Sequence, residues 1–585
     1  MTPSFIAVAA LAAIVMAAPP AAVSAAPAVA TYPAQGAAGV NPDVRLVLRF
    51  PGAPTLGTTG QIRIYDAADD RLVDTLDLAI PAGPAERAAG PYPSYLPAPY
   101  DYGGPRRTNA DTRAGTPSAP GLPPAGSDYQ LSIIGGFTDG FHFHPVIVRA
   151  DSAIITPHHN LLAYGKTYYV QVDPGVLALD DGSFAGLRGK LAWRFSTRAR
   201  GPAPDAGRVT VAADGSGDFD TVQGALDFVP EQHARRVTIF VKNGDYEEIV
   251  YARNKHGITI LGQERDRVRI HYANNEVFNP HPPGVGTNEL PGTFPSRRAA
   301  FALDHVHDVA LVNLTIASTL EGQAEGLLLN GERNLVSDVT VIGAGDALQV
   351  NGSTYLQRLR LVGGGDAILG RGPAFFRDCE IESPGPFMWI RNTQANHGNV
   401  FVDCAFRARG GALAVLARLP DNKGKNYPYA EAVLLRATLS GIAPPGWGPL
   451  DGATAGVRFW EFDSRGADGE PVDTGARHPA SRRLDRDRDA ALIASYGDPA
   501  WVLGGWRPAL APLILRQPQA ARAGAAIEVA VAAVPAPRYQ WLRDGKPIPG
   551  ATAARIVARQ AGMYAVRVRN AAGTLTSAAV RIAPR

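Results

Sequence analysis

The sequence predicts a mainly β protein in which a right-handed parallel β-helix is flanked by an N-terminal and a C-terminal β-sandwich. In the middle of the chain, short apolar strands recur every 20–25 residues, and such a period is typical of stacked β-helix coils. Residues 31–198 instead contain short runs in which apolar and polar residues alternate, as in half-buried antiparallel strands. The length of 585 residues, with 45% hydrophobic and 19% charged residues, suits about three globular domains.

The first 25 residues are expected to be a signal peptide. An uncharged apolar run extends from Phe5 to Ala18, and the small residues 22–25 offer a cleavage site. A transmembrane anchor is the alternative, because the segment lacks an early Lys or Arg, but Pro19 and Pro20 and the short run disfavour it. We therefore expect a secreted or periplasmic protein. Its net charge of +3 does not call for nucleic acid or a membrane as partner.

Residues 31–198 are predicted to form the N-terminal sandwich, with strands such as 44–50 and 166–172. The region resembles bacterial immunoglobulin-like modules, and a Pro/Gly-rich stretch at 90–127 interrupts it as an expected loop. Residues 199–206 are predicted to be a linker. The histidine pairs at 142/144 and 158/159 could share a zinc ion, but polar packing is the favoured interpretation because no acidic or Cys partner stands at a diagnostic spacing.

Residues 513–585 resemble an immunoglobulin-like domain. Trp541 and Tyr564 stand in the sequence contexts of the family's core aromatics, while Val529 and Val566 stand where the family has its cysteines. We expect a core closed by apolar packing instead of a disulfide. Neither sandwich carries visible catalytic residues, so both are predicted to be dispensable for chemistry.

The central region, 207–512, carries the repeat. Five short segments align on central residues separated by 25, 20, 20 and 25 positions, and these residues are predicted to form one inward stack: Leu314, Val339, Leu359, Cys379 and Cys404. A leucine-rich repeat has a similar period, but its consensus is absent. The two cysteines are expected to be a buried pair of free thiols, although stacked positions about 4.8 Å apart would also permit a disulfide.

The same register brings two aspartates together. Asp346 lies seven residues after Val339, and Asp366 lies seven residues after Leu359. Stacked coils would place their carboxyl groups about 5 Å apart. Two neighbouring carboxyl groups disfavour joint ionisation, so the pKa of one rises and that of the other stays low. This difference in pKa suits one acid/base and one nucleophile or base. From the repeat alone, a calcium site or a ladder of turn-capping Asp residues is the alternative.

Seven segments occur in the order found in pectin methylesterases, and together they resemble that family across roughly 240 residues. They are 209–230, 244–248 (G-x-Y-x-E), 323–327 (Q-A-V-A-L in the family), 345–348 (Q-D-T-L), 366–370 (D-F-I-F-G), 416–420 (L-G-R-P-W) and 445–447 (a late G-W pair).

The resemblance implies a role for four residues. Asp366 would be the nucleophile that attacks the ester carbonyl, and Asp346 would be the acid/base that assists the leaving methanol and then activates water. Gln323 would donate a hydrogen bond to the developing oxyanion, and Arg418 would hold Asp366 ionised. A polar turn residue and a surface salt bridge are the respective alternatives for Gln323 and Arg418. No metal or cofactor is implied.

Several departures from the family put the substrate in doubt. Gly345 replaces a Gln, while Ala367 and Leu369 replace two Phe residues. The Trp after Arg-Pro is also missing, and an extra Leu419 intervenes. The aromatics that could replace the lost sugar-binding surface, or could simply be core residues, are Trp389, Tyr427, Tyr429 and Trp447.

We therefore expect a monomeric esterase acting on methylated polygalacturonate (pectin), an acidic plant cell-wall polysaccharide, or on a related esterified polysaccharide. The competing hypotheses are a β-helix polysaccharide lyase or glycosidase and a non-catalytic carbohydrate-binding surface protein. A lyase would need a calcium cage, and the sequence suggests no acidic cluster around the Asp pair. A glycosidase could use two carboxylates at the same separation.

Overall fold

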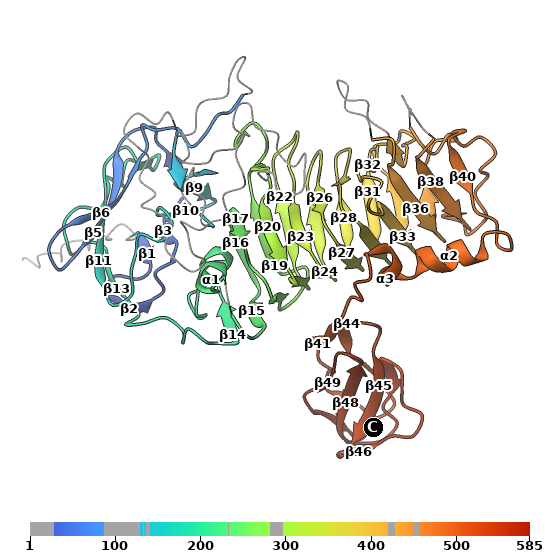
Figure 1. Cartoon of the computed structure of the whole chain (residues 1–585). Coiled ribbons are helices and arrows are strands. Elements are labelled where there is room, and N and C mark those ends of the chain that lie inside the picture. The colour runs from blue at the N-terminus through green and yellow to red at the C-terminus, as the bar shows by residue number, and fades with distance from the viewer. Residues whose placement is uncertain are drawn as a thin grey trace, which may run out of the picture.

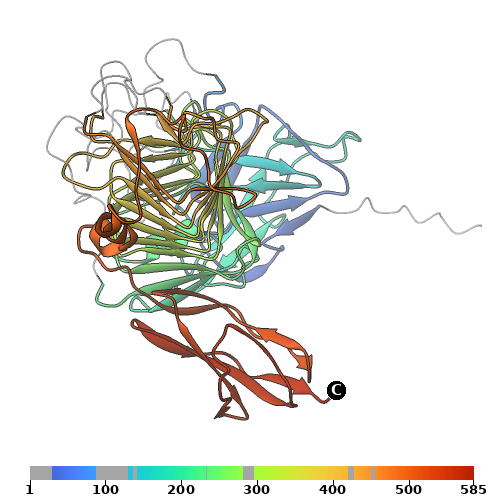
Figure 2. The same ribbon diagram turned by 90° about the vertical axis from the view of Figure 1, so that its right-hand side faces the viewer.

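The computed structural model describes residues 29–86, 129–132, 134–135, 141–231, 233–280, 296–418, 427–448 and 455–585. Its centre is a stack of coils built from three parallel sheets, with a β-sandwich at one end and a smaller β-domain to one side (Figure 1). Viewed along the stack, the coils superpose around one interior (Figure 2). The predicted fold class, a right-handed parallel β-helix with flanking sandwiches, is confirmed. The expected signal peptide, 1–25, lies outside the described residues.

Within the described residues, each of seven coils contributes one strand to each of the three parallel sheets, and the first and last coils contribute to one or two sheets only. The eleven-stranded sheet consists of β14 (Arg208–Val211), β15 (Val237–Val241), β18 (Ile258–Gly262), β21 (Ala310–Val312), β24 (Asn334–Ser337), β27 (Thr354–Gln357), β30 (Ala374–Arg377), β33 (Asn399–Val402), β36 (Glu431–Leu435), β38 (Arg458–Phe462) and β40 (Ser481–Arg483). The nine-stranded sheet consists of β16 (Gly244–Glu247), β19 (Val268–Tyr272), β22 (Thr315–Ser318), β25 (Thr340–Ile342), β28 (Arg360–Val362), β31 (Glu380–Ser383), β34 (Ala405–Ala408), β37 (Thr438–Ser440) and β39 (Arg465–Gly466). The seven-stranded sheet consists of β17 (Val250–Arg253), β20 (Phe301–His307), β23 (Leu327–Glu332), β26 (Leu348–Asn351), β29 (Ile368–Gly370), β32 (Met388–Ile390) and β35 (Ala417–Arg418).

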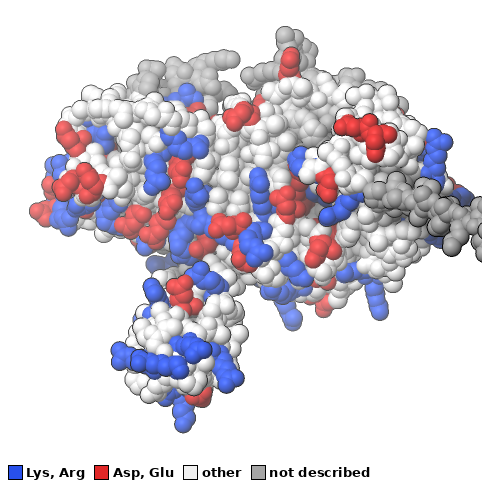
Figure 3. Space-filling model, turned by 180° about the vertical axis from the view of Figure 1, so that it is seen from behind, with Lys and Arg blue, Asp and Glu red and all other residues white. Residues whose placement is uncertain are grey.

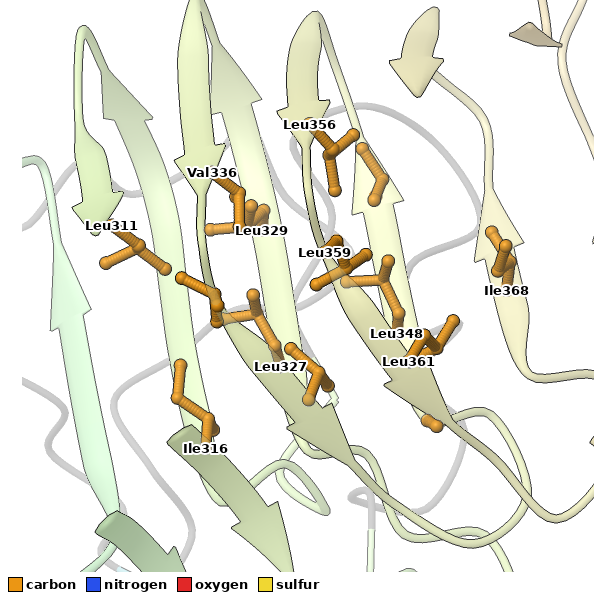
Figure 4. Packing of buried hydrophobic residues seen from close by; sticks show 14 of the residues in the cluster. Leu311, Ile316, Leu327, Leu329, Val336, Leu348, Leu356, Leu359, Leu361 and Ile368 are labelled. Atoms are coloured by element: carbon orange, nitrogen blue, oxygen red, sulfur yellow. The ribbon is translucent and has the colours of Figure 1, made fainter. Parts of the chain in front are cut away.

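The predicted inward stack of five residues is confirmed. All five are buried in the same core between the sheets. The peptide N–H of Thr340 donates to the carbonyl of Leu314, and that of Ala405 donates to the carbonyl of Cys379, so adjacent coils are in register there. Figure 4 shows neighbouring core residues such as Leu311, Leu329 and Leu348 directed into this interior. Cys379 and Cys404 are free, as favoured from the sequence.

A left-handed residue precedes each member of the stack and turns the chain between two sheets. Its φ lies between 47° and 60° at Asn313, Asp338, Arg358, Asp378 and Asp403. Asn and Asp tolerate this conformation better than most residues because their short polar side chains can hydrogen-bond locally. This turn explains why a polar residue recurs immediately before each buried one.

The N-terminal sandwich has a four-stranded and a five-stranded sheet. The first is β1 (Ala30–Tyr32), β3 (Leu46–Arg49), β10 (Ser152–Ile155) and β9 (Val146–Arg149); the second is β2 (Ala37–Val40), β13 (Arg194–Thr197), β11 (Thr167–Val172), β5 (Gln61–Asp66) and β6 (Leu72–Asp77). Two short pairs, β4 (Thr55–Leu56) with β12 (Leu177–Ala178) and β7 (Leu131–Ser132) with β8 (Phe141–His142), complete it. The pairs are antiparallel as expected, except that β2 and β13 are parallel.

This sandwich is fused to the β-helix by a continuous apolar core. Tyr251, Ala302 and Leu328, which point outward from the seven-stranded sheet, belong to the same cluster as the sandwich interior. Asp43 of the sandwich also accepts hydrogen bonds from the backbone N–H groups of Asp220 and Thr221, at 2.9 and 2.8 Å, at the start of α1 (Val222–Phe228). The sandwich therefore covers the outer face of the first coils.

The coil ladder ends at β40, earlier than the predicted boundary at 512. Two short helices follow, α2 (Ala490–Gly497) and α3 (Pro499–Val502), and their residues Tyr496 and Val502 pack with the outer face of the eleven-stranded sheet. An apolar sheet face must be covered by other elements, and here the two helices cover part of it. The repeat of 20–25 residues could not predict these helices, because they are not part of it. None of the helices within the described ranges combines the length and apolarity needed to cross a bilayer.

The C-terminal domain begins at β41. It contains β41 (Leu510–Arg516), β42 (Ala521–Arg522), β43 (Ala526–Glu528), β44 (Ala530–Val534), β45 (Arg538–Arg543), β46 (Lys546–Pro547), β47 (Arg555–Val557), β48 (Gly562–Asn570), β49 (Gly573–Thr576) and β50 (Val580–Ala583). Val529, Trp541 and Val566 share its core, so the expected apolar closure without a disulfide is present. The domain packs on the eleven-stranded sheet, where Gln357 Nε2 donates to the carbonyl of Ala533 at 3.2 Å.

Candidate active site

The two aspartates lie on adjacent coils, immediately before strands of the seven-stranded sheet. Gln323, Gly345 and Gly365 form successive parallel bridges, and the N–H of Asp346 donates to the carbonyl of Gly365 at 3.1 Å. Asp346 and Asp366 have φ values of 65° and 42°, in the left-handed region that few residue types enter without strain. The repeat register thus makes the two residues neighbours, as predicted from their spacing.

Arg418 forms a bidentate ion pair with Asp366. Its Nε donates to Oδ1 at 3.0 Å, and its Nη2 donates to Oδ2. This pair was expected from the family resemblance, and its geometry is the bidentate one that orients a carboxylate. Burial raises the pKa of Asp366 to about 6, and Arg418 opposes that rise. At neutral pH the carboxylate is mostly ionised and more basic than an ordinary one.

Asp346 is deeper and has a different cation. Arg298 Nη2 lies 2.8 Å from Asp346 Oδ2, 3.0 Å from Glu325 Oε1, and its Nη1 lies 3.6 Å from Glu276 Oε2. Burial raises the pKa values of Asp346 and Glu325, and Arg298 counteracts both rises. Arg391 and Arg418 also lower the pKa of Asp346, but burial outweighs the three guanidiniums, so this pKa lies above its ordinary value.

The expectation that no acidic cluster surrounds the Asp pair is therefore wrong. The sequence could have indicated Glu325 as an acidic neighbour of the site, because it lies in the 323–327 segment at a position where the family has Val. Arg298 and Glu276 belong to the long connection between β19 and β20, which carries no repeat and no motif. Within the described residues, however, no three His, Cys, Asp or Glu side chains are arranged to hold a metal ion.

One predicted substrate-binding aromatic, Trp389, contacts Arg418, and a second, Tyr427, contacts Trp389. The guanidinium carbons of Arg418 and Arg391 lie 5.2 and 4.7 Å from the ring centroid of Trp389. Tyr427 meets Trp389 edge to face, with ring centroids 6.4 Å apart, and both rings are partly exposed. Their position suits contact with a substrate next to Asp366, while the binding role itself stays a prediction.

The prediction for Trp447 is wrong. Only 1% of this residue is exposed; its ring stacks on Phe459 at 4.7 Å, and its Nε1 donates to Glu461 Oε1 at 3.2 Å. A ring enclosed in this way has no free face for a sugar. Trp447 closes the interior of the late coils.

Gln323 is exposed one coil before Asp346, at the same edge of the sheet. Gly345, where the family has Gln, lies close to the backbone of the preceding coil. A Cβ atom at Gly345 would lie 2.9 Å from the carbonyl oxygen of Gly322, so any side chain there would force a coil to shift. Gln323 thus has no second amide side chain beside it at position 345.

The histidines of the N-terminal sandwich serve packing, in line with the favoured interpretation. His158 Nδ1 lies 2.7 Å from Asp74 Oδ1, and His142 Nδ1 lies 2.6 Å from the carbonyl of Phe278. His144 stacks on Phe278 with ring centroids 4.8 Å apart. Phe278 belongs to the same segment as Glu276, which contacts Arg298. The structure thus argues against the expectation that the N-terminal sandwich is dispensable, because it supports the segment that reaches the Asp346 cluster.

Comparison with known proteins identifies the β-helix. Residues 208–483 match the pectinesterase family model. Pectinesterase QRT1 from Arabidopsis thaliana is 28% identical over 312 residues, which cover 50% of this chain and 77% of that protein. Pectinesterase/pectinesterase inhibitor U1 from Solanum lycopersicum is 26% identical over 51% of this chain and 50% of its own length.

Among solved structures, the carrot pectin methylesterase is similar with a TM-score of 0.43 and 23% identity, over 51% of this chain and 93% of its own. PemA from Erwinia chrysanthemi has a TM-score of 0.40 and 20% identity over 53% and 99%. Together with the ordered motifs and the coil register, the match of residues 208–483 supports placing the β-helical domain of this chain in the pectinesterase family of carboxylic ester hydrolases.

Proposed function

We propose that this protein removes methyl groups from methylated polygalacturonate or a closely related esterified polysaccharide, with Asp366 as its nucleophile. The observation that carries the proposal is the Asp366–Arg418 pair, set beside the buried Asp346 in a pectinesterase-family domain. An ionised carboxylate with a pKa of about 6 is a better nucleophile than one with an ordinary pKa, yet it is populated at neutral pH.

The chemistry follows from the two environments. Asp366 attacks the carbonyl carbon of the methyl ester, and Gln323 donates to the oxyanion that develops. Asp346, whose pKa is raised by burial, gives its proton to the departing methanol. The resulting Asp346 carboxylate then takes a proton from water, which attacks the acyl-enzyme and releases the free acid. The methyl group leaves as methanol, and both aspartates return to their starting states.

We expect the substrate to be recognised by the aromatic and Arg side chains near Arg418. Trp389 and Tyr427 offer partly exposed rings for a sugar face. Arg371 and Arg391 approach the same rings, and burial together with the positive charge of Arg371 lowers the pKa of Arg391. Two neighbouring guanidiniums favour an anionic partner, which a partly de-esterified uronate chain supplies. An acidic plant cell-wall polysaccharide, met after export from the cell, fits this surface.

One assay separates the proposed activity from its rivals. Highly methylated pectin is incubated with the full chain, and methanol, new reducing ends and the ultraviolet absorbance of unsaturated uronates are followed together. We expect methanol alone. Reducing ends without methanol would identify a glycosidase, unsaturated product would identify a lyase, and binding without any product would identify a carbohydrate-binding protein.

A further inference from the structure

The C-terminal domain carries a charge of its own. Residues 510–585 contain eleven Lys and Arg but only two acidic residues, Glu528 and Asp544, whereas the rest of the chain has 46 basic and 52 acidic residues. Ten of the eleven cations are exposed. Figure 3 shows Lys and Arg gathered over this small domain. A +9 domain on a chain that is otherwise acidic indicates an anionic partner.

Part of this charge lines a groove of about 900 Å³. Its cations are Arg543, Lys546, Arg555 and Arg559, and its one acidic residue is Asp544. The Oδ1 atom of Asp544 accepts from the N–H of Met563 at 2.8 Å, and its Oδ2 lies 3.9 Å from Arg543 Nε. Asp544 therefore offsets at most one of the four positive charges, and the groove stays strongly cationic.

The groove is also apolar between its charges. Ile548, Ile556 and Val557 line it, and Val557 is 54% exposed. A chain of uronate sugars presents carboxylates at intervals along rings that carry hydroxyl groups at their edges and apolar C–H groups on their faces. Alternating cations and apolar side chains match that pattern better than a uniformly charged surface does.

The backbone beneath the groove is held in place. Tyr564 Oη donates to the carbonyl of Gln560 at 2.9 Å, and Trp541 Nε1 donates to the carbonyl of Ala553 at 2.9 Å. β46 pairs with β45, and β47 pairs with β43. The segments that carry Lys546, Arg555 and Arg559 are thus fixed to the domain core, which lowers the entropy cost of binding.

We propose that this groove binds de-esterified polygalacturonate, the anionic product of the reaction. The proposal rests on the proposed function, because each methyl group removed there creates one carboxylate that the groove can pair with Arg or Lys. The domain packs on the eleven-stranded sheet, whereas Asp346 and Asp366 lie at the seven-stranded sheet. The groove is therefore a second binding site that keeps the protein on polymer regions already processed.

The same domain offers a matched control surface. Arg538, Arg567 and Arg569 are exposed on the outer face of β45 and β48, with Arg538 directly opposite Arg569. These three cations do not line the groove. Replacing them removes the same charge as replacing Lys546, Arg555 and Arg559, so the two triple variants separate a site from general attraction.

The test measures binding of the full chain to polygalacturonate and to highly methylated pectin by isothermal calorimetry. Wild type should prefer polygalacturonate. The Lys546→Gln/Arg555→Gln/Arg559→Gln variant should bind it about tenfold more weakly or worse, from three lost ion pairs. The Arg538→Gln/Arg567→Gln/Arg569→Gln variant should change less than about threefold, since these cations contribute only long-range attraction. Equal losses in both variants, or no preference for polygalacturonate, would overturn the proposal.

Two further arms complete the design. A single-stranded oligonucleotide of equal charge should compete weakly; stronger binding than polygalacturonate would assign the groove to nucleic acid and reject the proposal. Methanol release from short soluble oligomers should be unchanged in the groove variant. If the wild type binds polygalacturonate through the groove but releases no methanol, the proposed function fails alone; if it releases methanol but the groove variant binds normally, this inference fails alone.

Discussion

Replacing Arg418 with Ala should convert the Asp366 carboxyl into a weaker, pH-dependent nucleophile. Arg418 contacts Asp366 through Nε at 3.0 Å and a second nitrogen, and the pKa of Asp366 is about 6 with this cation in place. An Arg beside a carboxylate commonly lowers its pKa by about one to three units. Because 41% of the Arg418 side chain is exposed, solvent screening reduces the effect, and we expect a shift of about one to two units.

The magnitude of the rate loss then depends on pH. At a pH below the pKa of Asp366 in both the wild type and Arg418→Ala, each unit by which the pKa rises lowers the ionised fraction of Asp366 tenfold. A rise of one to two units should therefore lower kcat/KM about 10- to 100-fold. Near pH 9 the carboxyl is ionised in both proteins, and the ionisation part of the loss should disappear, while a constant loss from poorer orientation persists. The alkaline limit is set by the proton on Asp346.

The assay is methanol release from highly methylated pectin between pH 4 and 9. Arg436→Ala is the matched control, because Arg436 grips Asp403 with the same two nitrogens, at 2.7 and 3.0 Å, on an exposed turn outside the site. Its profile should equal that of the wild type. A loss in Arg418→Ala that is the same at every pH would refute the reasoning that Arg418 acts through the ionisation of Asp366.

Three further predictions follow from the same geometry. Asp346→Asn should release about one methanol per chain in a burst and then stall, because the amide can donate a hydrogen bond but cannot activate water; rapid-quench assays that find steady turnover would exclude this role. The unfolding free energy of the wild type should fall between pH 4 and 7, since the folded-state pKa of Asp366 of about 6 exceeds the ordinary aspartate pKa of about 3.9 and stability from the bound proton is lost as pH rises. Asp366→Asn should remove up to about 3 kcal/mol of that fall in urea titrations, and an unchanged slope would contradict it. Gly345→Gln, which restores the family's residue, should destabilise the fold by about 1–3 kcal/mol without raising kcat, and a thermal denaturation temperature equal to that of wild type would show that the coil accommodates it.

The repeat carried most of what the sequence could predict. In stacked coils, residues at equivalent repeat positions lie side by side. The equal spacing of Asp346 after Val339 and of Asp366 after Leu359 was therefore enough to predict that the two aspartates are neighbours. The contact between Arg418 and Asp366 depended on the family resemblance, because Arg418 is separated from Asp366 by further coils and an irregular segment. Repeat positions predict which residues are neighbours in space only in the part of the chain where the repeat continues.

The residues that sequence reasoning missed lie where the repeat is broken. Arg298 and Glu276 come from the long connection between β19 and β20, and Phe278, two residues after Glu276, packs against His142 and His144 of the N-terminal sandwich. Trp447 was misassigned for a related reason: it follows a turn and belongs to no strand, so alternation of inward and outward side chains could not tell which way its ring points.

The most direct test of the account is the methanol released from highly methylated pectin by Asp366→Asn, with Asp403→Asn as a control that alters an exposed carboxylate in an equivalent Arg pair. The amide cannot form the acyl-enzyme, so methanol release should fall by roughly 10³-fold or more while circular dichroism shows the fold retained. Asp403→Asn should keep the wild-type rate. Full activity in Asp366→Asn would contradict the assignment of Asp366 as the nucleophile.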